Sequence, residues 1–177
     1  MVVQKRFHKN YRIRDTGEGL VEAVLGAPPI GREIEQTIRH GVVQARLSLG
    51  SLAYRPYQQL QLAATLTIEP GWHVYAIPVP EGYTPLTLEV TPVQGLEVGK
   101  VTWPDPHPFR IEGLEDQFFV LEGTVRSTVP LTFAFSPGAG TQTVRAVIRY
   151  QACSTTECLP PGEVRFELLV PELPRIA

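Results

Sequence analysis

Apolar and polar residues alternate along most of the chain from about residue 42 onward. Within residues 59–69 the alternation is strict, and the apolar positions are Leu60, Leu62, Ala64, Leu66 and Ile68. A period of two residues is typical of a β-strand with one buried face. The same period recurs in residues 43–49, 86–90, 131–135, 144–150 and 164–170. Weaker strand patterns occupy residues 72–77, 96–103 and 118–125.

Turn-forming residues separate these runs. The 17 prolines and 15 glycines are spread along the chain, and they cluster between the strand patterns, as at Pro70-Gly71, Gly95, residues 104–108 and Pro160-Pro161-Gly162. From residue 42 onward, about nine short strands with no helical pattern between them favour an all-β fold. We therefore expect an immunoglobulin-like antiparallel β-sandwich.

The first forty residues have a different pattern. Residues 2–14 are mixed and basic, residues 17–25 have the apolar spacing of a helix, and residues 31–39 form a second amphipathic stretch after Pro28-Pro29. A strand followed by a helix indicates α/β structure. We expect residues 1–40 to be a short α/β N-terminal extension, either a linker or the tail of a preceding thioredoxin-like domain, and residues 41–177 to be the sandwich. In a fusion of that kind, the sandwich would serve its upstream neighbour.

Composition argues against binding to nucleic acid and against a membrane span. Charged residues make up 19% of the chain and the formal net charge is −2, which argues against a nucleic-acid partner. No apolar run approaches the length of a membrane span, so we do not expect the chain to cross a membrane. The N-terminus also lacks the apolar core of a secretory signal peptide.

The two cysteines, Cys153 and Cys158, lie in one short segment. Four intervening residues allow the two Cα atoms to approach within the roughly 4.4–6.8 Å that a disulfide requires. Closing so short a loop stabilises a fold by only about 2 kcal/mol, and a domain of this size has little need of such a bridge. The residues themselves leave both an exchangeable redox pair and a passive structural bridge open.

Other chemistry has weaker support. A zinc site would need His73 and His107 beside the two cysteines, but no second ligand pair follows at the usual spacing, so we expect no metal. The sequence also lacks a Gly-x-Ser-x-Gly elbow, a phosphate-binding loop and a His-Glu-x-x-His motif. These absences argue against hydrolase and nucleotide-binding functions.

Two motifs together resemble the N-terminal periplasmic domain of the thiol:disulfide interchange protein DsbD. The first is Tyr150-Gln151-Ala152-Cys153, followed by Cys158-Leu159-Pro160-Pro161, and the second is Pro70-Gly71-Trp72-His73-Val74-Tyr75. The resemblance covers roughly residues 42–171. Some members of this family have one more residue between the cysteines, so the hairpin here is tighter.

The resemblance implies a thiol-disulfide oxidoreductase that needs no cofactor. In this family the hairpin cysteines receive electrons from a membrane-embedded partner and pass them to thioredoxin-fold proteins in the periplasm. The resemblance further implies that Cys158 forms the bond to the partner and that Cys153 resolves it. The alternative is a non-catalytic immunoglobulin-like binding module in which the same disulfide is only structural.

The resemblance also implies roles for residues around the cysteines. Phe118, within the segment 115–119, matches an aromatic cap over the disulfide, and Asp116, His73 and Tyr75 match other positions near the sulfurs. A carboxylate beside a thiol disfavours the thiolate, whereas a protonated histidine favours it. Without the resemblance, Phe118 and Tyr75 would be interpreted as ordinary core aromatics and His73 as a surface or core histidine.

Overall fold

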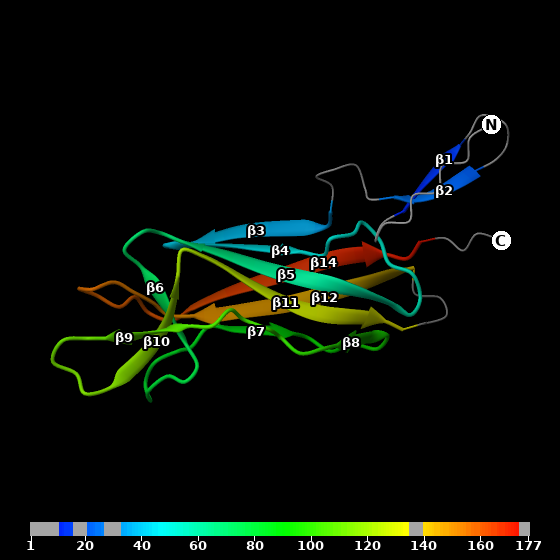
Figure 1. Ribbon diagram of the computed structural model, residues 1–177. Coiled ribbons are helices and arrows are strands. Elements are labelled where there is room, and N and C mark those ends of the chain that lie inside the picture. The colour runs from blue at the N-terminus through cyan, green and yellow to red at the C-terminus, as the bar shows by residue number, and fades with distance from the viewer. Residues whose placement is uncertain (1–10, 16–20, 27–32, 135–139, 174–177) are drawn as a thin grey trace.

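The computed structural model describes residues 11–15, 21–26, 33–134 and 140–173. Every regular element in these ranges is a β-strand, and all the strand pairs in its sheets are antiparallel. The expected all-β, immunoglobulin-like sandwich is therefore confirmed. Figure 1 shows two long sheets stacked on each other, with a smaller sheet at one end.

The larger layer is a five-stranded sheet in the order β3-β4-β5-β11-β8. Its strands are β3 (Glu35–His40), β4 (Val43–Ser48), β5 (Gln58–Ile68), β11 (Thr124–Phe133) and β8 (Leu96–Val98). The longest pairing joins β5 and β11 along ten residue pairs, from Thr67 opposite Thr124 to Gln58 opposite Phe133. This pairing keeps the alternating apolar positions of both strands on the inner face.

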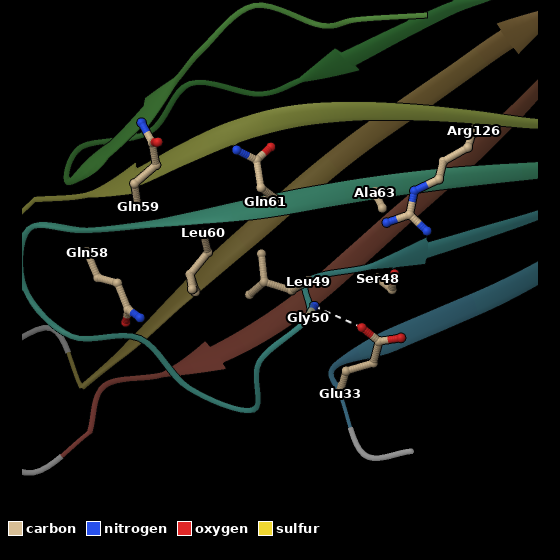
Figure 2. Close-up of a pocket in the computed structure, with 10 residues that line it drawn as sticks. All are labelled: Glu33, Ser48, Leu49, Gly50, Gln58, Gln59, Leu60, Gln61, Ala63 and Arg126. Carbon is tan, nitrogen blue, oxygen red and sulfur yellow. Dashed lines mark hydrogen bonds between the residues drawn. The ribbon is translucent and has the colours of Figure 1, made fainter. Parts of the chain in front are cut away.

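A polar groove lies on this sheet where β5 begins, at the end far from β6 (Figures 1 and 2). Three glutamines of β5 and Arg126 of β11 are among its lining residues. At its rim, Glu33 accepts a hydrogen bond of 2.9 Å from the backbone N–H of Gly50. The residues that line the groove include no cysteine or histidine, so it is separate from the thiol chemistry described below.

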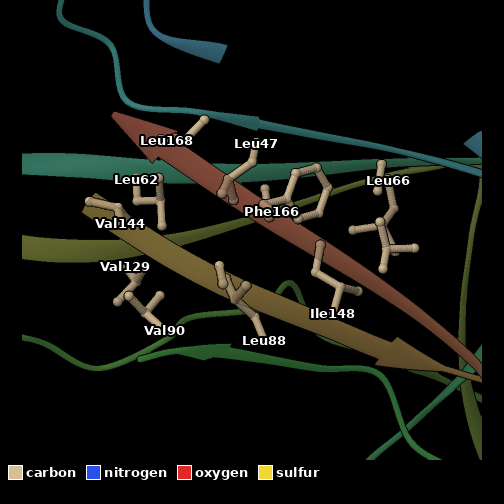
Figure 3. Packing of buried hydrophobic residues seen from close by; sticks show 14 of the residues in the cluster. Leu47, Leu62, Leu66, Leu88, Val90, Val129, Val144, Ile148, Phe166 and Leu168 are labelled. Carbon is tan, nitrogen blue, oxygen red and sulfur yellow. The ribbon is translucent and has the colours of Figure 1, made fainter. Parts of the chain in front are cut away.

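The second layer is a three-stranded sheet in the order β14-β12-β7, formed by Gly162–Pro171, Thr141–Tyr150 and Thr87–Val90. Its inner side chains interdigitate with those of the five-stranded sheet to form the main core (Figure 3). Leu62, Leu66, Ile148 and Phe166 are central members and are almost completely buried. Because β12 and β14 are both anchored in this core, the segment that joins them is held firmly at its base.

A four-stranded sheet in the order β13-β6-β10-β9 closes one end of the sandwich (Figure 1). It consists of Ala152–Cys153, His73–Ala76, Gln117–Glu122 and His107–Arg110. Successive side chains of a strand point to opposite faces. Val74, Ala76 and Leu121 belong to the main core, whereas Tyr75 and Phe118 belong to a second buried cluster. This small sheet therefore separates two apolar environments.

The prediction of helices near the N-terminus is wrong for the residues that the structure describes there. Residues 21–26 form β2, which pairs with β1 (Tyr11–Asp15), and residues 35–40 form β3, which pairs with β4 along its whole length. The five-stranded sheet thus includes residues that precede the expected start of the sandwich at residue 41. The division into residues 1–40 and 41–177 stays a prediction, and residues 1–10, 16–20 and 27–32, which include parts of both expected helices, lie outside the described ranges.

Two other strand boundaries differ from expectation. The segment expected as one strand over residues 118–125 is divided at Gly123, whose φ of 69° lies in a region that favours glycine, so β10 ends and β11 begins there. His107–Arg110, partly inside the stretch expected to be a turn, forms the edge strand β9. Proline is tolerated in edge strands, where its missing N–H breaks no ladder bond.

Candidate functional site

The two cysteines lie on the hairpin that joins β12 to β14. Cys153 ends β13, Cys158 faces it across an isolated antiparallel bridge, and the two sulfurs form a disulfide with a Cα–Cα distance of 4.1 Å. Figure 1 shows this orange hairpin extending beyond β6 at the end of the sandwich. The disulfide therefore lies at an extremity of the domain, where another protein can approach.

Hydrogen bonds hold the hairpin independently of the disulfide. The backbone N–H of Ser154 donates to the Glu157 carbonyl at 2.8 Å, and the N–H of Leu159 donates to the Ala152 carbonyl at 2.9 Å. The Ser154 hydroxyl accepts from the N–H groups of Thr156 and Glu157 at 3.2 and 3.1 Å. None of these bonds involves sulfur, so the turn has its own support when the disulfide opens.

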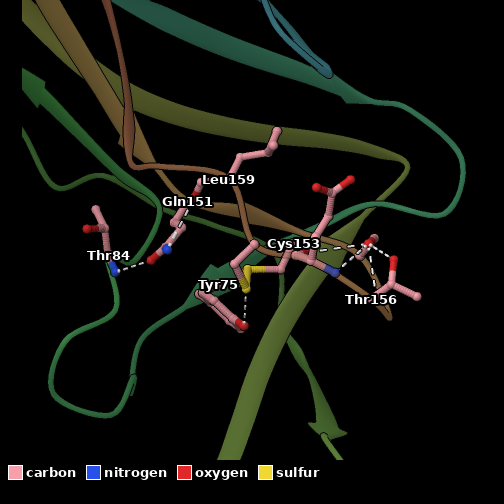
Figure 4. Close-up of a disulfide and its surroundings, with 9 residues drawn as sticks. Tyr75, Thr84, Gln151, Cys153, Thr156 and Leu159 are labelled. Carbon is pink, nitrogen blue, oxygen red and sulfur yellow. Dashed lines mark hydrogen bonds between the residues drawn. A yellow bond between two sulfur atoms is a disulfide. The ribbon is translucent and has the colours of Figure 1, made fainter.

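Further contacts fix the base of the hairpin. The Gln151 amide oxygen accepts from the backbone N–H of Thr84 at 3.0 Å, and its nitrogen donates to the Leu159 carbonyl at 3.3 Å (Figure 4). The hydroxyl of Tyr150 donates to the His40 carbonyl at 3.0 Å. A Cβ atom on Gly162 would lie 2.7 Å from the Tyr150 ring, so only glycine fits this close approach.

The two cysteines differ in burial. Cys153 has 1% of its surface exposed, whereas Cys158 lies in the exposed turn. Attack on a disulfide requires that the attacked sulfur be accessible to the incoming thiolate. Cys158 is therefore the more exposed residue of the pair.

Aromatic side chains pack against the disulfide. Tyr75, Phe118 and Val120 form a buried cluster with Cys153, and Tyr83 packs at its margin. The ring centroid of Tyr75 lies 5.1 Å from that of Phe118 and 5.2 Å from that of Tyr83. Such separations are favourable for aromatic pairs. The rings of Tyr75, Phe118 and Tyr83, called the aromatic wall below, thus cover the disulfide on this side.

Tyr75 also makes a polar contact with the disulfide. Its hydroxyl lies 3.5 Å from Sγ of Cys158, and Figure 4 shows it pointing at the sulfur. Burial raises the pKa of Tyr75, and the neighbouring Tyr83 raises it further. The phenol therefore keeps its proton at neutral pH and can donate a hydrogen bond to a Cys158 thiolate.

His73 lies directly opposite Cys153 in the pairing of β6 with β13. Its side chain is 4% exposed, its ring centroid lies 4.4 Å from that of Phe109, and its Nε2 has no hydrogen-bond partner. Burial lowers the pKa of His73, and the Glu122 carboxylate opposes this effect without reversing it. The imidazole is therefore neutral at neutral pH.

The structure brings three of the four expected surrounding residues to the disulfide. His73, Tyr75 and Phe118 share the face of the four-stranded sheet that carries Cys153, whereas Asp116 lies exposed in the turn before β10. Phe118 lies within β10, in the region expected to be a strand, and is fully buried. Its function as a cap, and the influence of Asp116 on the thiols, stay predictions.

Three residues of the site were missed by the sequence analysis. Phe109 packs against His73 with the two rings tilted by 47°, Tyr83 packs edge-on against Phe118, and Gln151 joins the hairpin to the segment after β6 by a hydrogen bond. Phe109 follows a proline-rich stretch that suggests a turn, and Tyr83 lies among turn residues. Gln151 belongs to the motif Tyr150-Gln151-Ala152-Cys153 identified in the sequence, but the motif gave no sign of its hydrogen bond to Thr84.

Within the described residues, neither a candidate metal centre nor a membrane-spanning helix is found. Across the described residues, no group of three or more His, Cys, Asp or Glu side chains is arranged to hold a metal ion. The same part of the chain includes no helix long and apolar enough to cross a membrane. The chemistry that this site offers is that of the two sulfurs.

Solved structures include two proteins that this chain resembles. One is the N-terminal periplasmic domain of ScsB from Proteus mirabilis, with 16% identity and a TM-score of 0.55 over 79% of this chain and 52% of that one. The other is the reduced N-terminal domain of DsbD from Neisseria meningitidis, with 16% identity and a TM-score of 0.42 over 60% of this chain and 74% of that one. This chain thus matches about half the length of the ScsB domain, and at this identity the likeness concerns the fold.

The family comparison is more specific. Among curated proteins, none matches this chain. The family model described as "Thiol:disulfide interchange protein DsbD, N-terminal" matches residues 45–170, which include the whole cysteine hairpin and most of the sandwich. The chain therefore belongs to the family of DsbD N-terminal domains, which are thiol-disulfide interchange domains with a disulfide-forming cysteine pair.

Proposed function

We propose that this domain is a thiol-disulfide oxidoreductase that relays electrons through a reversible Cys153–Cys158 disulfide. Its electron donor would be a membrane-embedded partner, its acceptors would be thioredoxin-fold proteins, and it would act in the periplasm or another extracytoplasmic compartment. The observation that carries the proposal is the unequal burial of two joined cysteines, with Cys158 exposed and Cys153 buried at the end of the sandwich.

The exchange follows from this arrangement in two steps. In the reduced domain the Cys158 thiolate attacks one sulfur of an acceptor disulfide, and a mixed disulfide forms as the other acceptor sulfur leaves and is protonated. Cys153 then attacks Sγ of Cys158 as a thiolate, which re-forms the Cys153–Cys158 bond and releases the second acceptor sulfur. Two electrons have passed to the acceptor, and the two sulfurs of this domain are oxidised.

The surroundings of the disulfide support this function. Hydrogen bonds that involve no sulfur hold the hairpin, so opening the disulfide does not remove its support. The aromatic wall formed by Tyr75, Tyr83 and Phe118 excludes water from one side of the buried sulfur. We propose that Phe118 slows reduction by small thiols and that a protein partner displaces it, because a buried ring beside a disulfide can act as a gate.

A trapping experiment tests the proposal. The Cys153→Ser variant keeps Cys158 as its single thiol and is expected to accumulate a mixed disulfide with a thioredoxin-fold protein, visible as a dithiothreitol-sensitive band on a non-reducing gel. The matched Cys158→Ser variant keeps only the buried thiol and should trap little. Trapping by Cys158→Ser alone would reverse the order of the cysteines, and trapping by neither would leave the hairpin disulfide as a structural bridge.

A further inference from the structure

Strand β6 carries one polar side chain near each cysteine of the disulfide. Tyr75 places its hydroxyl 3.5 Å from Sγ of Cys158, and His73, two residues earlier on the same face, lies directly opposite Cys153. Directly opposed residues of antiparallel strands have Cβ atoms about 4.5–5.5 Å apart. The imidazole of His73 is therefore within reach of the Cys153 sulfur without any change in the backbone.

The Nε2 atom of His73 is buried and has no hydrogen-bond partner. Buried polar atoms are nearly always paired in folded proteins, and an unpaired one costs about 1–3 kcal/mol. The oxidised Cys153 sulfur carries no hydrogen and cannot donate a bond to this nitrogen. A reduced Cys153 carries an S–H group, which is a donor. The reduced Cys153 thiol can therefore offer His73 a donor that the disulfide cannot.

The groups that face His73 keep it neutral before that step. Glu122 of β10 lies opposite His73, and His107 of β9 lies with its Nε2 3.7 Å from the Glu122 carboxylate. Tyr75 lies beside it on β6 and Cys153 opposite it on β13. Burial lowers the pKa of His73 and His107 lowers it further, and together they outweigh the Glu122 carboxylate, which favours a proton on His73. A neutral imidazole can accept a proton, whereas a charged one cannot.

We propose that His73 is the proton acceptor for the thiol of Cys153 during resolution of the mixed disulfide. This proposal rests on the proposed function. The proton moves from Cys153 Sγ to His73 Nε2, and the resulting thiolate attacks Sγ of Cys158. The Cys153–Cys158 bond forms as the bond from Cys158 to the acceptor sulfur breaks. The acceptor leaves as a thiolate and is reprotonated by the imidazolium of His73, which returns to its neutral form.

A synthetic aromatic disulfide separates the two steps. When the fully reduced domain is mixed with 5,5′-dithiobis(2-nitrobenzoate), attack by Cys158 releases one coloured thiolate in a phase that depends on reagent concentration. Closure of the Cys153–Cys158 bond releases a second coloured thiolate in a phase that does not. The rate of the second phase measures how readily Cys153 becomes a thiolate.

The variants His73→Phe and His73→Gln are expected to slow the second phase by about 100-fold at neutral pH, within the usual range for a general base. The first phase should change little in both. In the wild type, the second-phase rate should fall as the pH decreases through the lowered pKa of His73, and this inflection should be absent from both variants. The matched control is His107→Gln, which removes the exposed histidine of the same face. In this variant the Cys153–Cys158 bond should form at nearly the wild-type rate.

Two results would overturn the proposal. Second phases at the wild-type rate in both His73 variants, with an unchanged pH profile, would show that His73 only packs against Phe109. Absence of any reaction of the wild-type thiols with the reagent would instead refute the proposed function, and the inference with it. Should His73→Phe fail to fold, as judged by thermal unfolding of its oxidised form, the smaller change in His73→Gln decides the matter.

Discussion

Both faces of the four-stranded sheet carry buried side chains, but these side chains differ in kind. The face toward the main core carries Val74, Ala76, Leu121 and Ala152, which are aliphatic and have no polar atoms in their side chains. The opposite face carries the buried cluster of Tyr75, Phe118, Val120 and Cys153. It also carries His73, whose Nε2 has no hydrogen-bond partner.

This difference separates stability from chemistry within a single small sheet. Aliphatic packing on the core face holds β6, β10 and β13 in a fixed register, which sets the positions of the residues on the other face. Polar atoms near a buried disulfide cost stability, so their presence on only one face indicates that this face has a further function. The comparison predicts different effects for substitutions on neighbouring positions of the same strand.

The largest contrast is expected between two substitutions on β10. Leu121→Ala removes packing from the core face and should lower the free energy of unfolding by about 2–5 kcal/mol, with little change in the rate at which a small thiol reduces the folded domain. Phe118→Ala should also lower stability, but it should speed reduction on the order of tenfold, which corresponds to about 1.4 kcal/mol in the barrier.

Urea unfolding measures the first quantity, and stopped-flow reduction by dithiothreitol under native conditions measures the second. Equal acceleration in both variants would mean that general loosening of the fold exposes the disulfide. An unchanged rate in Phe118→Ala would remove the gating function of that ring.

A smaller effect is expected from Tyr75→Phe, which keeps the ring and removes the hydroxyl beside Cys158. Loss of a hydrogen bond to the thiolate should raise the pKa of the Cys158 thiol by about one unit, or about 1.4 kcal/mol. The absorbance of the thiolate near 240 nm, followed against pH in the Cys153→Ser background, measures this pKa. Tyr83→Phe is the matched control because Tyr83 contributes its ring to the same wall, and an equal shift in both variants would contradict a specific hydroxyl–sulfur contact.

The smallest effect concerns how the free energy of unfolding depends on pH. The pKa of His73 is lowered in the folded, oxidised domain, so below its ordinary value of 6.5 the unfolded chain binds a proton that the folded chain does not. The stability that depends on a neutral His73 is therefore present above that pH and is lost as the pH falls. As the pH falls below that value, the free energy of unfolding of the wild type should decrease relative to that of His73→Phe. The decrease should be at most about 1.4 kcal/mol for each pH unit.

Urea titrations of both proteins at several pH values measure this difference. His107→Gln, which changes an exposed histidine of the same face, provides the control. A stability difference between wild type and His73→Phe that stays constant with pH would show that His73 titrates alike in the folded and unfolded states.

Much of the sandwich could be predicted because alternation reports directly on one-sided burial. Strands β5, β12 and β14 follow the expected apolar positions closely, since each packs one face on the core. The error at β3 has a physical cause. This edge strand is only partly buried and Ile38 is its one apolar residue, so no alternation of apolar and polar positions marks it as a strand.

The site was only partly predictable for a different reason. Spacing alone identified Cys153 and Cys158 as a pair, and the family resemblance added His73, Tyr75 and Phe118. The contributions of Phe109 and Tyr83 depend on the register of β9 with β10 and on the path of the chain after β6. Neither of these leaves a periodic signal in the sequence, because both segments are rich in turn-forming residues.

The reduction potential of the Cys153–Cys158 pair tests the central claim most directly. The oxidised domain would be equilibrated with mixtures of reduced and oxidised dithiothreitol or glutathione, and the fraction of free thiol measured by alkylation. Structural disulfides usually lie below about −300 mV, whereas exchange-active pairs are more oxidising. We expect a potential above that value, and a potential well below it would contradict electron relay and favour a binding module with a permanent disulfide.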